Sequence, residues 1–276
     1  MLELLHSAGA CAAGCVSYAR LRPLMSPESR RQAEEQLPGL CSLLCAAFPY
    51  GPEDPAPGPI SLYARGADYH TVLRVRLAPV IETLSSRFPG HQFLCFADAS
   101  PFPEVAAAAL AGLGTVGQNG LLLTPDAGSY VFLGFLATDA SLPETGDGTI
   151  HPCPGCGACL RACPGAALPA PPDPTRCLSA LTQQRGVLSE EQQALIRRAA
   201  VLWGCDRCQL VCPENRRRTV FALPEFAPLP PPTASDLALS DRAFRRAFAG
   251  RAFTWRGVQP LRRNQSLLPS PEPHTP

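Results

Sequence analysis

Four cysteines in the middle of the chain follow the spacing of an iron–sulfur motif. Residues 151–168, HPCPGCGACLRACPGAAL, contain Cys-x2-Cys-x2-Cys-x3-Cys followed by proline. In such motifs the first three thiolates bind one [4Fe–4S] cluster and the fourth binds a second cluster. A shorter version, CDRCQLVCP, returns at residues 205–213. The spacing therefore predicts two [4Fe–4S] clusters, each of which is bound by one cysteine from the other motif.

The ligands can be divided between the two predicted clusters by applying this rule to both motifs. Cys163 crosses from the first motif to the second cluster, and Cys212, which precedes a proline, crosses back. The second cluster then lacks a ligand, and Cys177 is the remaining cysteine of the segment. The predicted sets are Cys153, Cys156, Cys159 and Cys212 for the first cluster and Cys163, Cys177, Cys205 and Cys208 for the second.

Zinc is the alternative metal, because four cysteines also form structural zinc sites. Zinc motifs usually consist of separate Cys-x2-Cys pairs, whereas the first run is unbroken and both motifs end in Cys-Pro. Iron–sulfur clusters are therefore the favoured interpretation. The other five of the thirteen cysteines follow no such pattern, and we expect them to be small buried side chains. They are Cys11, Cys15, Cys41, Cys45 and Cys95.

Two clusters need only a small part of 276 residues, so the remainder must form at least one further domain. No run approaches the roughly 20 apolar residues of a membrane span, and the N-terminus shows no basic leader. Together with the metal-type cysteine spacing, this predicts a protein of the reducing cytoplasm with no membrane association. The net charge is +1, and every basic residue is arginine. The chain as a whole is therefore not strongly basic.

The elements that must position the chemistry can be read from the apolar pattern. We expect two helices and then a buried strand in residues 1–48, and a loop at 51–59. A mostly helical stretch should occupy 60–88, kinked or divided at Pro79. A short buried strand at 91–100, a helix at 103–114 and a strand–turn–strand at 120–139 follow. This order indicates a mixed α+β or α/β domain over residues 1–145.

The rest of the chain divides into two further predicted parts. Residues 146–222 form the ferredoxin-like domain, with a helix that Ser189 caps. Residues 223–276 comprise a linker, a short helix at 235–250 and a disordered tail, LLPSPEPHTP. Aromatic residues interleave the arginines between Arg242 and Arg263. That stretch could clamp RNA by stacking or form an amphipathic helix with a solvated face, and both interpretations stay open.

Three stretches of the first domain hold residues that packing alone does not require. ARGADYH, residues 64–70, gathers arginine, aspartate, tyrosine and histidine. Asp98 ends an apolar strand, where burial would raise its pKa and suit it to general acid catalysis; it or Ser100 could instead cap the next helix. GLGTVGQNG, residues 112–120, is rich in glycine, but it follows a helix rather than a strand, which argues against a dinucleotide site.

In this order, these stretches resemble the epoxyqueuosine reductase family, which modifies tRNA. The resemblance runs from about residue 40 to residue 264 and is carried by ARGADYH, LCFADASPFPEVAAAALAGLGTVGQNGLLLTPDAGSYVFLGFLATD, both cysteine motifs, RCLSALT and LRRN. It implies a cobalamin-binding domain similar to that of reductive dehalogenases, followed by a ferredoxin-like domain with two [4Fe–4S] clusters. It also implies that electrons pass from the clusters to cobalamin, and that epoxyqueuosine in a tRNA anticodon loop is reduced to queuosine.

The resemblance implies roles for particular residues of the sequence. Asp98 would donate a proton to the epoxide oxygen. The residues at the cobalamin or substrate pocket would be Arg65, His70, Asp98, Gly114, Asn119, Leu122, Leu133, Ser179 and Asp206. The expected partners are the tRNA anticodon loop and an external electron donor such as a flavodoxin or a ferredoxin, and the expected state is a monomer.

The chain departs from the family pattern in two respects. Gln118 stands in the glycine loop where members often have lysine, and the sequence ends about a dozen residues after LRRN, where many members continue into helical repeats. The near-neutral charge also gives little sign of an RNA-binding platform. Two alternatives therefore stay open. One is a related corrinoid iron–sulfur reductase with a smaller substrate, and the other is an electron carrier without catalysis, against which Asp98 and the glycine loop argue.

Overall fold

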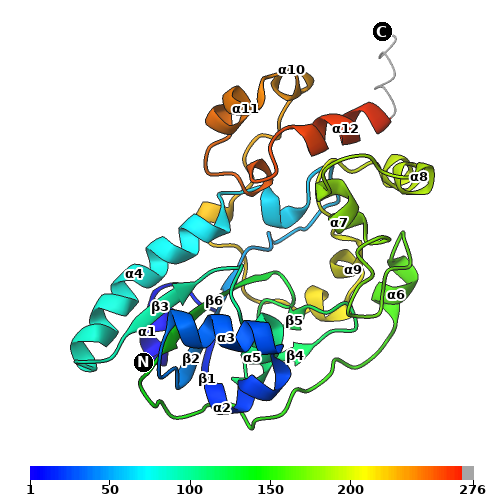
Figure 1. Cartoon of the computed structure of the whole chain (residues 1–276). Helices are drawn as coiled ribbons and strands as arrows, with labels where there is room; N and C mark the ends of the chain where they lie inside the picture. The colour runs from blue at the N-terminus through cyan, green and yellow to red at the C-terminus, as the bar shows by residue number, and fades with distance from the viewer. Residues whose placement is uncertain (269–276) are drawn as a thin grey trace.

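The computed structural model describes residues 1–268 (Figure 1). Its largest sheet has the strand order β1-β2-β6-β3, and every neighbouring pair is antiparallel. The strands are β1 (Ala12–Ser17), β2 (Ser42–Pro49), β3 (Phe93–Phe96) and β6 (Val131–Thr138), and a small second sheet pairs β4 (Thr115–Val116) with β5 (Leu122–Leu123). The predicted mixture of helices and strands is confirmed, and the sheet is antiparallel, as in α+β proteins.

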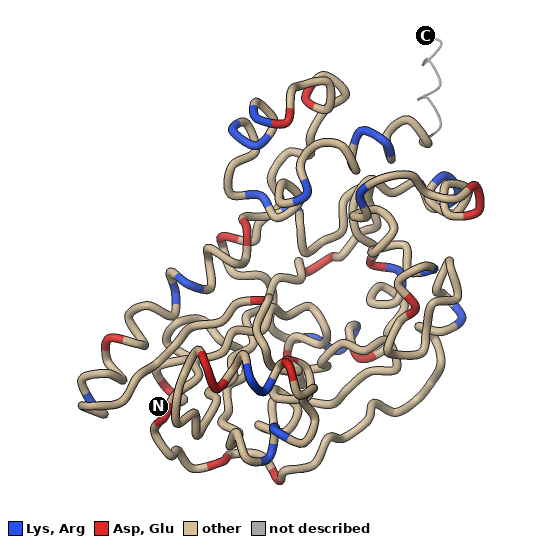
Figure 2. Tube along the Cα trace, viewed as in Figure 1, with Lys and Arg blue, Asp and Glu red and all other residues tan. Residues whose placement is uncertain are grey.

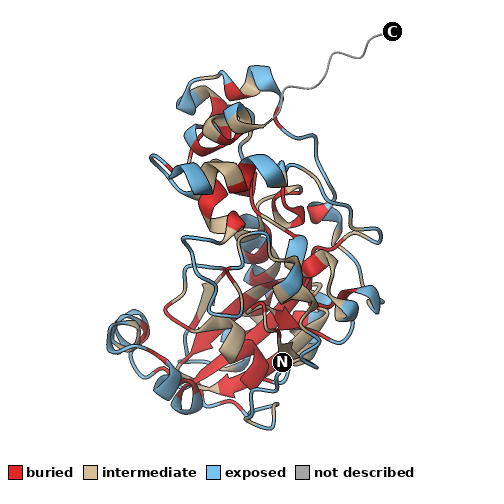
Figure 3. Cartoon of the chain, turned by 90° about the vertical axis from the view of Figure 1, so that its right-hand side faces the viewer, coloured by how far each residue is buried: buried red, intermediate tan, exposed pale blue. Residues whose placement is uncertain are grey.

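Helices cover both faces of this sheet. Alternate side chains of β2 point to opposite sides, so Leu44 and Phe48 join the apolar cluster beneath α1 (Leu2–Ser7) and α4 (Tyr69–Arg87). Leu43 and Cys45 join the cluster on the other face. The helices there are α2 (Tyr18–Leu21), α3 (Pro27–Gln36) and α5 (Glu104–Leu110). All eight residues of β2 are buried, which explains its continuously apolar sequence, and Figure 3 shows the buried residues concentrated in the strands.

Two details of the first domain differ from the sequence prediction. Residues 12–17 form β1, whereas two helices and a single strand were expected in residues 1–48; that assignment is wrong here because pairing with β2, rather than local propensity, makes AAGCVS a strand. α4 also continues through Pro79 without being divided. Pro79 lies on the exposed face of the helix, where water can bond the carbonyl group that loses its partner.

The cysteine-rich segment folds into short helices. They are α6 (Ala158–Ala162), α7 (Leu178–Gln183), α8 (Glu190–Ala199) and α9 (Arg207–Leu210). The predicted cap of α8 is confirmed: Ser189 and Gln192 form a capping box in which each side chain accepts a bond from the other's backbone N–H. α7 and α8 pack together through Leu181 and Ile196.

The segment after residue 223 returns to pack on the rest of the chain. It contains α10 (Ala234–Leu237), α11 (Asp241–Ala247) and α12 (Gln259–Leu267), so two short helices replace the single predicted helix at 235–250. Phe244 and Phe253 are buried in one cluster with Ile60 and Trp203. These two phenylalanines therefore belong to a core and cannot stack on RNA, whereas Trp255 is 50% exposed.

The three predicted domains share apolar contacts, and their boundaries remain a prediction. Five 3-10 turns complete the secondary structure of the described residues, at Arg22–Leu24, Leu62–Ala64, Pro213–Arg216, Pro224–Phe226 and Ala252–Thr254. Within residues 1–268, no helix combines the length and the apolar character needed to cross a bilayer.

The predicted disordered tail lies outside the described residues from residue 269 onward.

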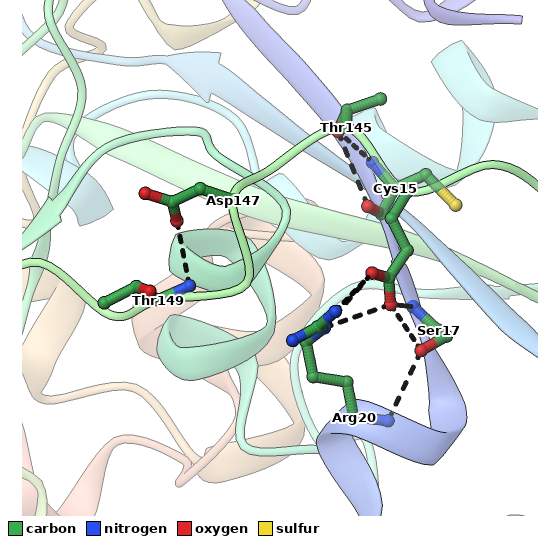
Figure 4. A network of polar contacts seen from close by, with 7 residues as sticks. Cys15, Ser17, Arg20, Thr145, Asp147 and Thr149 are labelled. Atoms are coloured by element: carbon green, nitrogen blue, oxygen red, sulfur yellow. Dashed lines mark hydrogen bonds and ion pairs between the residues drawn. The ribbon is translucent and has the colours of Figure 1, made fainter.

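A polar network ties the entry of the cysteine-rich segment to the edge of the sheet domain (Figure 4). Glu144 and Arg20 form an ion pair with an N–O distance of 2.8 Å. The Thr145 hydroxyl accepts a bond of 2.8 Å from the Cys15 backbone N–H. The chain that leads to the first cysteine motif is therefore anchored on β1 and α2 before it leaves the domain.

Candidate functional site

A cavity of about 410 Å³ lies between the sheet domain and the cysteine-rich segment. Its walls come from the start of α4, the loop before α5, β6, α7 and α9, which are far apart in the sequence. Residues of several chemical types face it, among them Tyr63, Tyr69, Asp98, Glu104, Asn119, Phe132, Leu133, Ser179, Cys163, Cys177, Cys205 and Cys208. Asp98 and the whole second predicted cysteine set thus line one and the same cavity.

Asp98 is held by side chains from the start of α4. The Tyr69 hydroxyl donates a bond of 2.7 Å to Asp98 Oδ2, and His70 Nε2 lies 3.3 Å from the same oxygen. On its other side, His70 Nδ1 lies 2.6 Å from Asp68 Oδ1. Asp68 is the N-cap of α4 and also accepts the His70 backbone N–H. The start of the helix therefore places His70 between two carboxylates, and ARGADYH and Asp98 form one site.

The pKa of Asp98 is lowered, which corrects the expectation of a raised value. The bond from His70 is the main cause, and the Tyr69 hydroxyl and the Ala99 backbone N–H add to it against the effect of burial. The Asp98 side chain is 54% exposed, so burial is modest. The pKa of His70 rises to about 9, because Asp68 and Asp98 accept its two ring N–H groups. At neutral pH the proton therefore resides on His70, and Asp98 is a carboxylate.

The loop that carries Asp98 is strained and does not cap α5. Asp98 and Ala99 have φ angles of 61° and 52°, in the left-handed region that non-glycine residues rarely occupy. α5 begins after Pro103 without a side-chain cap. The predicted capping alternative is therefore wrong for Asp98. Two consecutive residues keep this strained conformation only where contacts with the surrounding structure stabilise it. Here the bonds of Asp98 to Tyr69 and His70 provide that stabilisation.

Glu104 is a second carboxyl group in the cavity that the sequence reasoning missed. It stands at the start of α5 and lines the cavity together with Asp98. Ser100, on the same loop as Asp98, donates a bond of 2.7 Å to Glu104 Oε1. Burial raises the pKa of Glu104, and the charge of Asp98 adds to the effect. The cavity therefore contains two acidic groups whose environments move their pKa values in opposite directions.

Most of the predicted cluster ligands lie near one another, in the region where the helices α6 and α9 pack together. Burial raises the pKa of Cys159, and the charges of nearby Cys153 and Cys212 add to it. Burial likewise raises the pKa of Cys205 to about 11, with contributions from Cys177 and Cys163. Cys177 thus lies near Cys205, whereas Cys208 lies near Cys159 of the first predicted set as well as near Cys205 and Cys163. The division of the ligands between two clusters therefore stays a prediction.

In the described part of the chain, the thiols and their neighbours form no site for a single metal ion. All thirteen cysteines are free of disulfide bonds. Among residues 1–268, no three His, Cys, Asp or Glu side chains lie close enough to share one metal ion. In a [4Fe–4S] cluster, by contrast, each thiolate binds a different iron atom, so the ligands surround a body several atoms wide.

Three more of the residues expected at the pocket line the cavity: Asn119, Leu133 and Ser179. Asn119 is buried in the glycine loop, and its side chain contacts the Cys208 thiol. Leu133 belongs to β6, and Ser179 stands in the first turn of α7, two residues after Cys177. These residues connect the cavity with the second cysteine set.

Arg65, Gly114, Leu122 and Asp206 do not line the cavity. Arg65 Nε donates to the Ile60 carbonyl group at 2.7 Å. Leu122 is buried in the core of the sheet domain. A Cβ atom at Gly114 would lie 2.1 Å from the backbone oxygen of Leu123, so glycine is needed for the loop to approach β5. These residues support the cavity walls from behind.

Asp206 joins two walls of the cavity. It is buried, and it accepts a bond of 2.5 Å from the Ser61 hydroxyl and one of 2.9 Å from the Leu62 backbone N–H. Ser61 and Cys205 both line the cavity. Burial raises the pKa of Asp206 while these bonds oppose the rise. Asp206 therefore docks the loop before α4 onto the turn that carries Cys205 and Cys208.

Two other lining residues were not among the residues that the sequence reasoning assigned to the pocket. The ring of Tyr69 stacks between His70, at 4.0 Å, and Phe132, at 4.3 Å. Gln209 accepts bonds from the hydroxyl groups of Tyr50 and Ser129. Tyr69 stands inside ARGADYH and Gln209 inside CDRCQLVC, so their positions in these motifs were the available signal.

Comparison with known proteins identifies the family of both parts of this site. Residues 152–215 match the family "4Fe-4S double cluster binding domain", and residues 30–99 match the family "Epoxyqueuosine reductase QueG, DUF1730". An epoxyqueuosine reductase of Gloeobacter violaceus is 37% identical over 261 residues, which cover 90% of this chain and 82% of that protein.

Two solved structures share the fold over nearly the whole chain. One is an epoxyqueuosine reductase with an epoxyqueuosine-modified tRNA-Tyr stem loop (TM-score 0.82, 29% identity), and the other is the Bacillus subtilis epoxyqueuosine reductase with its catalytic aspartate loop swung out of the active site (TM-score 0.81, 29% identity). Each match covers 96% of this chain and 79% of the other.

The chain is shorter than some of its relatives. The matched region spans 54% of the enzyme of Listeria monocytogenes, which is 37% identical, and 60% of that of Lactococcus garvieae, which is 38% identical. The match to the Gloeobacter violaceus protein, by contrast, extends over most of both chains. The chain therefore belongs to the epoxyqueuosine reductase family.

Proposed function

We propose that this chain reduces the epoxide of epoxyqueuosine in a tRNA anticodon loop to queuosine, with electrons that pass from two [4Fe–4S] clusters through cobalamin. The observation that carries the proposal is the single cavity lined by Asp98 and by Cys163, Cys177, Cys205 and Cys208. A proton source and an electron source that face one cavity fit a reduction that consumes both. Membership of the family, whose named relatives are epoxyqueuosine reductases, supports the same reaction.

The lining of the cavity suits the corrin ring of cobalamin. It combines apolar walls, such as Phe132 and Leu133, with a few polar groups, such as Asn119 and Ser179. When bound, cobalamin supplies a low-valent cobalt that receives electrons singly from the clusters. We assign its binding to the domain of residues 1–145, and likeness to the corrinoid domain of reductive dehalogenases remains part of the proposal.

Residues of this chain would supply the two protons that the reaction consumes. Converting an epoxide to an alkene breaks two C–O bonds and consumes two electrons and two protons, and the oxygen leaves as water. The first proton would come from the Asp98–His70 pair, in which His70 stores the proton and Asp98 faces the cavity. Glu104, whose pKa burial raises, would supply the second. A loop with a catalytic aspartate in the Bacillus subtilis enzyme supports the role of Asp98.

The cluster ligands and the supporting residues follow from the same arrangement. We assign Cys153, Cys156, Cys159 and Cys212 to the first cluster and Cys163, Cys177, Cys205 and Cys208 to the second. Asn119, Leu133 and Ser179 would contact the cofactor. Arg65, Gly114, Leu122 and Asp206 would act as positioning residues, because they hold the walls without facing the cavity.

The partners are tRNA and a soluble electron donor. A relative solved with an epoxyqueuosine-modified tRNA stem loop supports tRNA as the substrate. Because each turnover consumes two electrons, a flavodoxin or a ferredoxin would have to reload the clusters. A monomer in the cytoplasm remains our prediction for the working state.

Anaerobic reconstitution with iron, sulfide and cobalamin tests this function. The protein should retain corrin absorbance after desalting and, with a chemical reductant, convert epoxyqueuosine-containing tRNA to queuosine, measured by mass spectrometry of the nucleosides. Asp98→Asn should keep both cofactors and lose turnover, whereas the matched variant Asp54→Asn, on the exposed loop at 51–59, should behave as the parent. Loss of corrin on desalting would refute the cobalamin site, and full turnover by Asp98→Asn would refute its role in proton donation.

A further inference from the structure

A second cavity, separate from the one that contains Asp98, is lined by arginines. It measures about 630 Å³ and lies between the loop that follows α7 and the helices α11 and α12. We name it the arginine hollow, after Arg185, Arg245, Arg256 and Arg263. Asp241 is the only carboxylate among its described lining residues, which leaves a surplus of three positive charges. Figure 2 shows basic positions in α11 and α12, at the end of the molecule away from the large sheet.

Two of the four guanidinium groups are already bonded to protein partners. Arg263 bonds the backbone oxygens of Leu181, Gln184 and Gly186, and Arg245 pairs with Asp241 at 2.8 Å. These two groups contribute mainly charge and structure.

Arg185 and Arg256 are less committed. The Arg185 side chain is exposed, and it makes a long bond of 3.4 Å to the Arg256 backbone oxygen. Arg256 Nε is buried without a hydrogen-bond partner within residues 1–268. Because both guanidinium groups line the hollow and arginine forms strong bonds with phosphate, an anion is the ligand that suits this pair.

An aromatic platform stands beside these cations. The guanidinium carbon of Arg256 lies 3.7 Å from the centre of the Trp255 ring, and the Trp255 side chain is 50% exposed. Arginine planes and aromatic rings are the surfaces on which unpaired RNA bases stack, while phosphates bind arginine. An acidic protein segment would bind the arginines but would have no group that stacks on the exposed Trp255 ring. The combination therefore favours RNA.

The arginine hollow is connected to the active-site cavity by a single short helix. Ser179, at the start of α7, lines the active-site cavity, and Gln184, directly after its end, lines the arginine hollow. A helix of six residues is about 9 Å long, which equals roughly two to three nucleotides of a stacked strand at about 3.4 Å each. The two cavities are therefore spaced for one RNA strand to reach both.

From these observations we propose that the arginine hollow binds phosphates of the tRNA strand whose modified nucleotide enters the active-site cavity. This inference rests on the proposed function for the identity of the RNA. It adds a binding site at Arg185, Trp255 and Arg256 that is distinct from the cofactor cavity. Phosphates a few nucleotides from the reacting base would bind there and fix the register of the strand.

The test measures RNA binding by the double variant Arg185→Gln/Arg256→Gln. The probe is an unmodified tRNA-Tyr anticodon stem loop, whose affinity is followed by fluorescence anisotropy over a range of salt concentrations. The dissociation constant should rise roughly tenfold, and the plot of log K against log salt should become less steep by about 1.4, since each lost phosphate contact in a single strand contributes about 0.7. The control Arg31→Gln/Arg87→Gln removes the same charge from α3 and α4, where both side chains are exposed, and should leave both quantities near the parent values.

Three outcomes would overturn the inference. They are parent-like binding by the double variant, equal weakening in the control pair, and displacement of the stem loop by poly-glutamate at equal charge concentration, which would indicate an acidic protein partner. If the double variant is unstable to heat, the single variant Arg185→Gln is tested instead, because that side chain is exposed and its loss should not disturb the fold. Arg185→Lys should then restore the salt dependence of the parent protein. Binding of the stem loop requires neither cobalamin nor the epoxide, so weakened binding without any conversion would refute the proposed function and leave this inference standing.

Discussion

Replacing Asp98 with asparagine should lower the pKa of His70 without returning it to the ordinary value. In the parent protein that pKa is raised from 6.5 to about 9 by bonds to two carboxylates, of which Asp68 has the larger effect. The distances agree with this order: His70 Nδ1 lies 2.6 Å from Asp68, and Nε2 lies 3.3 Å from Asp98. Asp98→Asn removes the weaker bond, so the pKa of His70 should settle between 6.5 and 9. Asp68→Asn should lower it further.

The measurement is a titration of the histidine ring nitrogens by NMR in the protein without cofactors. The chain has five histidines, and the signal missing from His70→Gln identifies the right one. Asp147→Asn is the matched control, because Asp147 pairs with the exposed His151 at 2.7 Å; it should leave the pKa of His70 unchanged. A parent pKa near 6.5, or an identical value in Asp98→Asn, would falsify the assignment of the stored proton to His70.

The same pair sets a direction for the dependence on pH. The pKa of His70 is higher in the folded protein than its ordinary value, so its contribution to stability is complete below pH 6.5 and disappears as the pH rises through about 9. Turnover in the proposed reaction should fall over the same upper range, because the stored proton is lost. A rate that stays constant to pH 10 would contradict a proton held on His70.

Three further variants test other parts of the structure. Glu104→Gln can still accept the bond from the loop serine, so it should fold normally and lower kcat by roughly 10²- to 10⁴-fold; single-turnover rates equal to the parent's would remove its role in the second proton transfer. Cys177→Ser should reduce the iron content from about eight to about four atoms per chain, and an unchanged iron count would show that Cys177 is not a ligand. Asn264→Leu leaves two buried carbonyl groups without the Nδ2 donor that now lies 2.7 and 2.8 Å away, so urea unfolding should show a loss of about 2–5 kcal/mol, while the exposed control Ser266→Ala should change stability by less than about 0.5 kcal/mol.

Where a feature depends on neighbours in the sequence, the prediction was close to the structure. β2 was expected as a buried strand, because a strand covered on both faces has a continuously apolar sequence. The cap of α8 at Ser189 was also expected, since a capping box involves residues three positions apart. β1 was missed because its residues are neutral in propensity and become a strand by pairing with β2.

The sequence by itself led to the predicted cysteine sets of this protein. In each motif the cysteine that precedes proline is assigned to the other cluster, so spacing alone divided the predicted ligands and left Cys177 to complete the second set. Only the tertiary structure decided where the proton sits. Asp98 and His70 are 28 residues apart in the chain, and a pKa depends on contacts of about 3 Å, which no spacing reveals. Contact with His70 changed the expected neutral acid at Asp98 into a carboxylate, and folding likewise gathered Arg185, Arg245, Arg256 and Arg263 into one hollow.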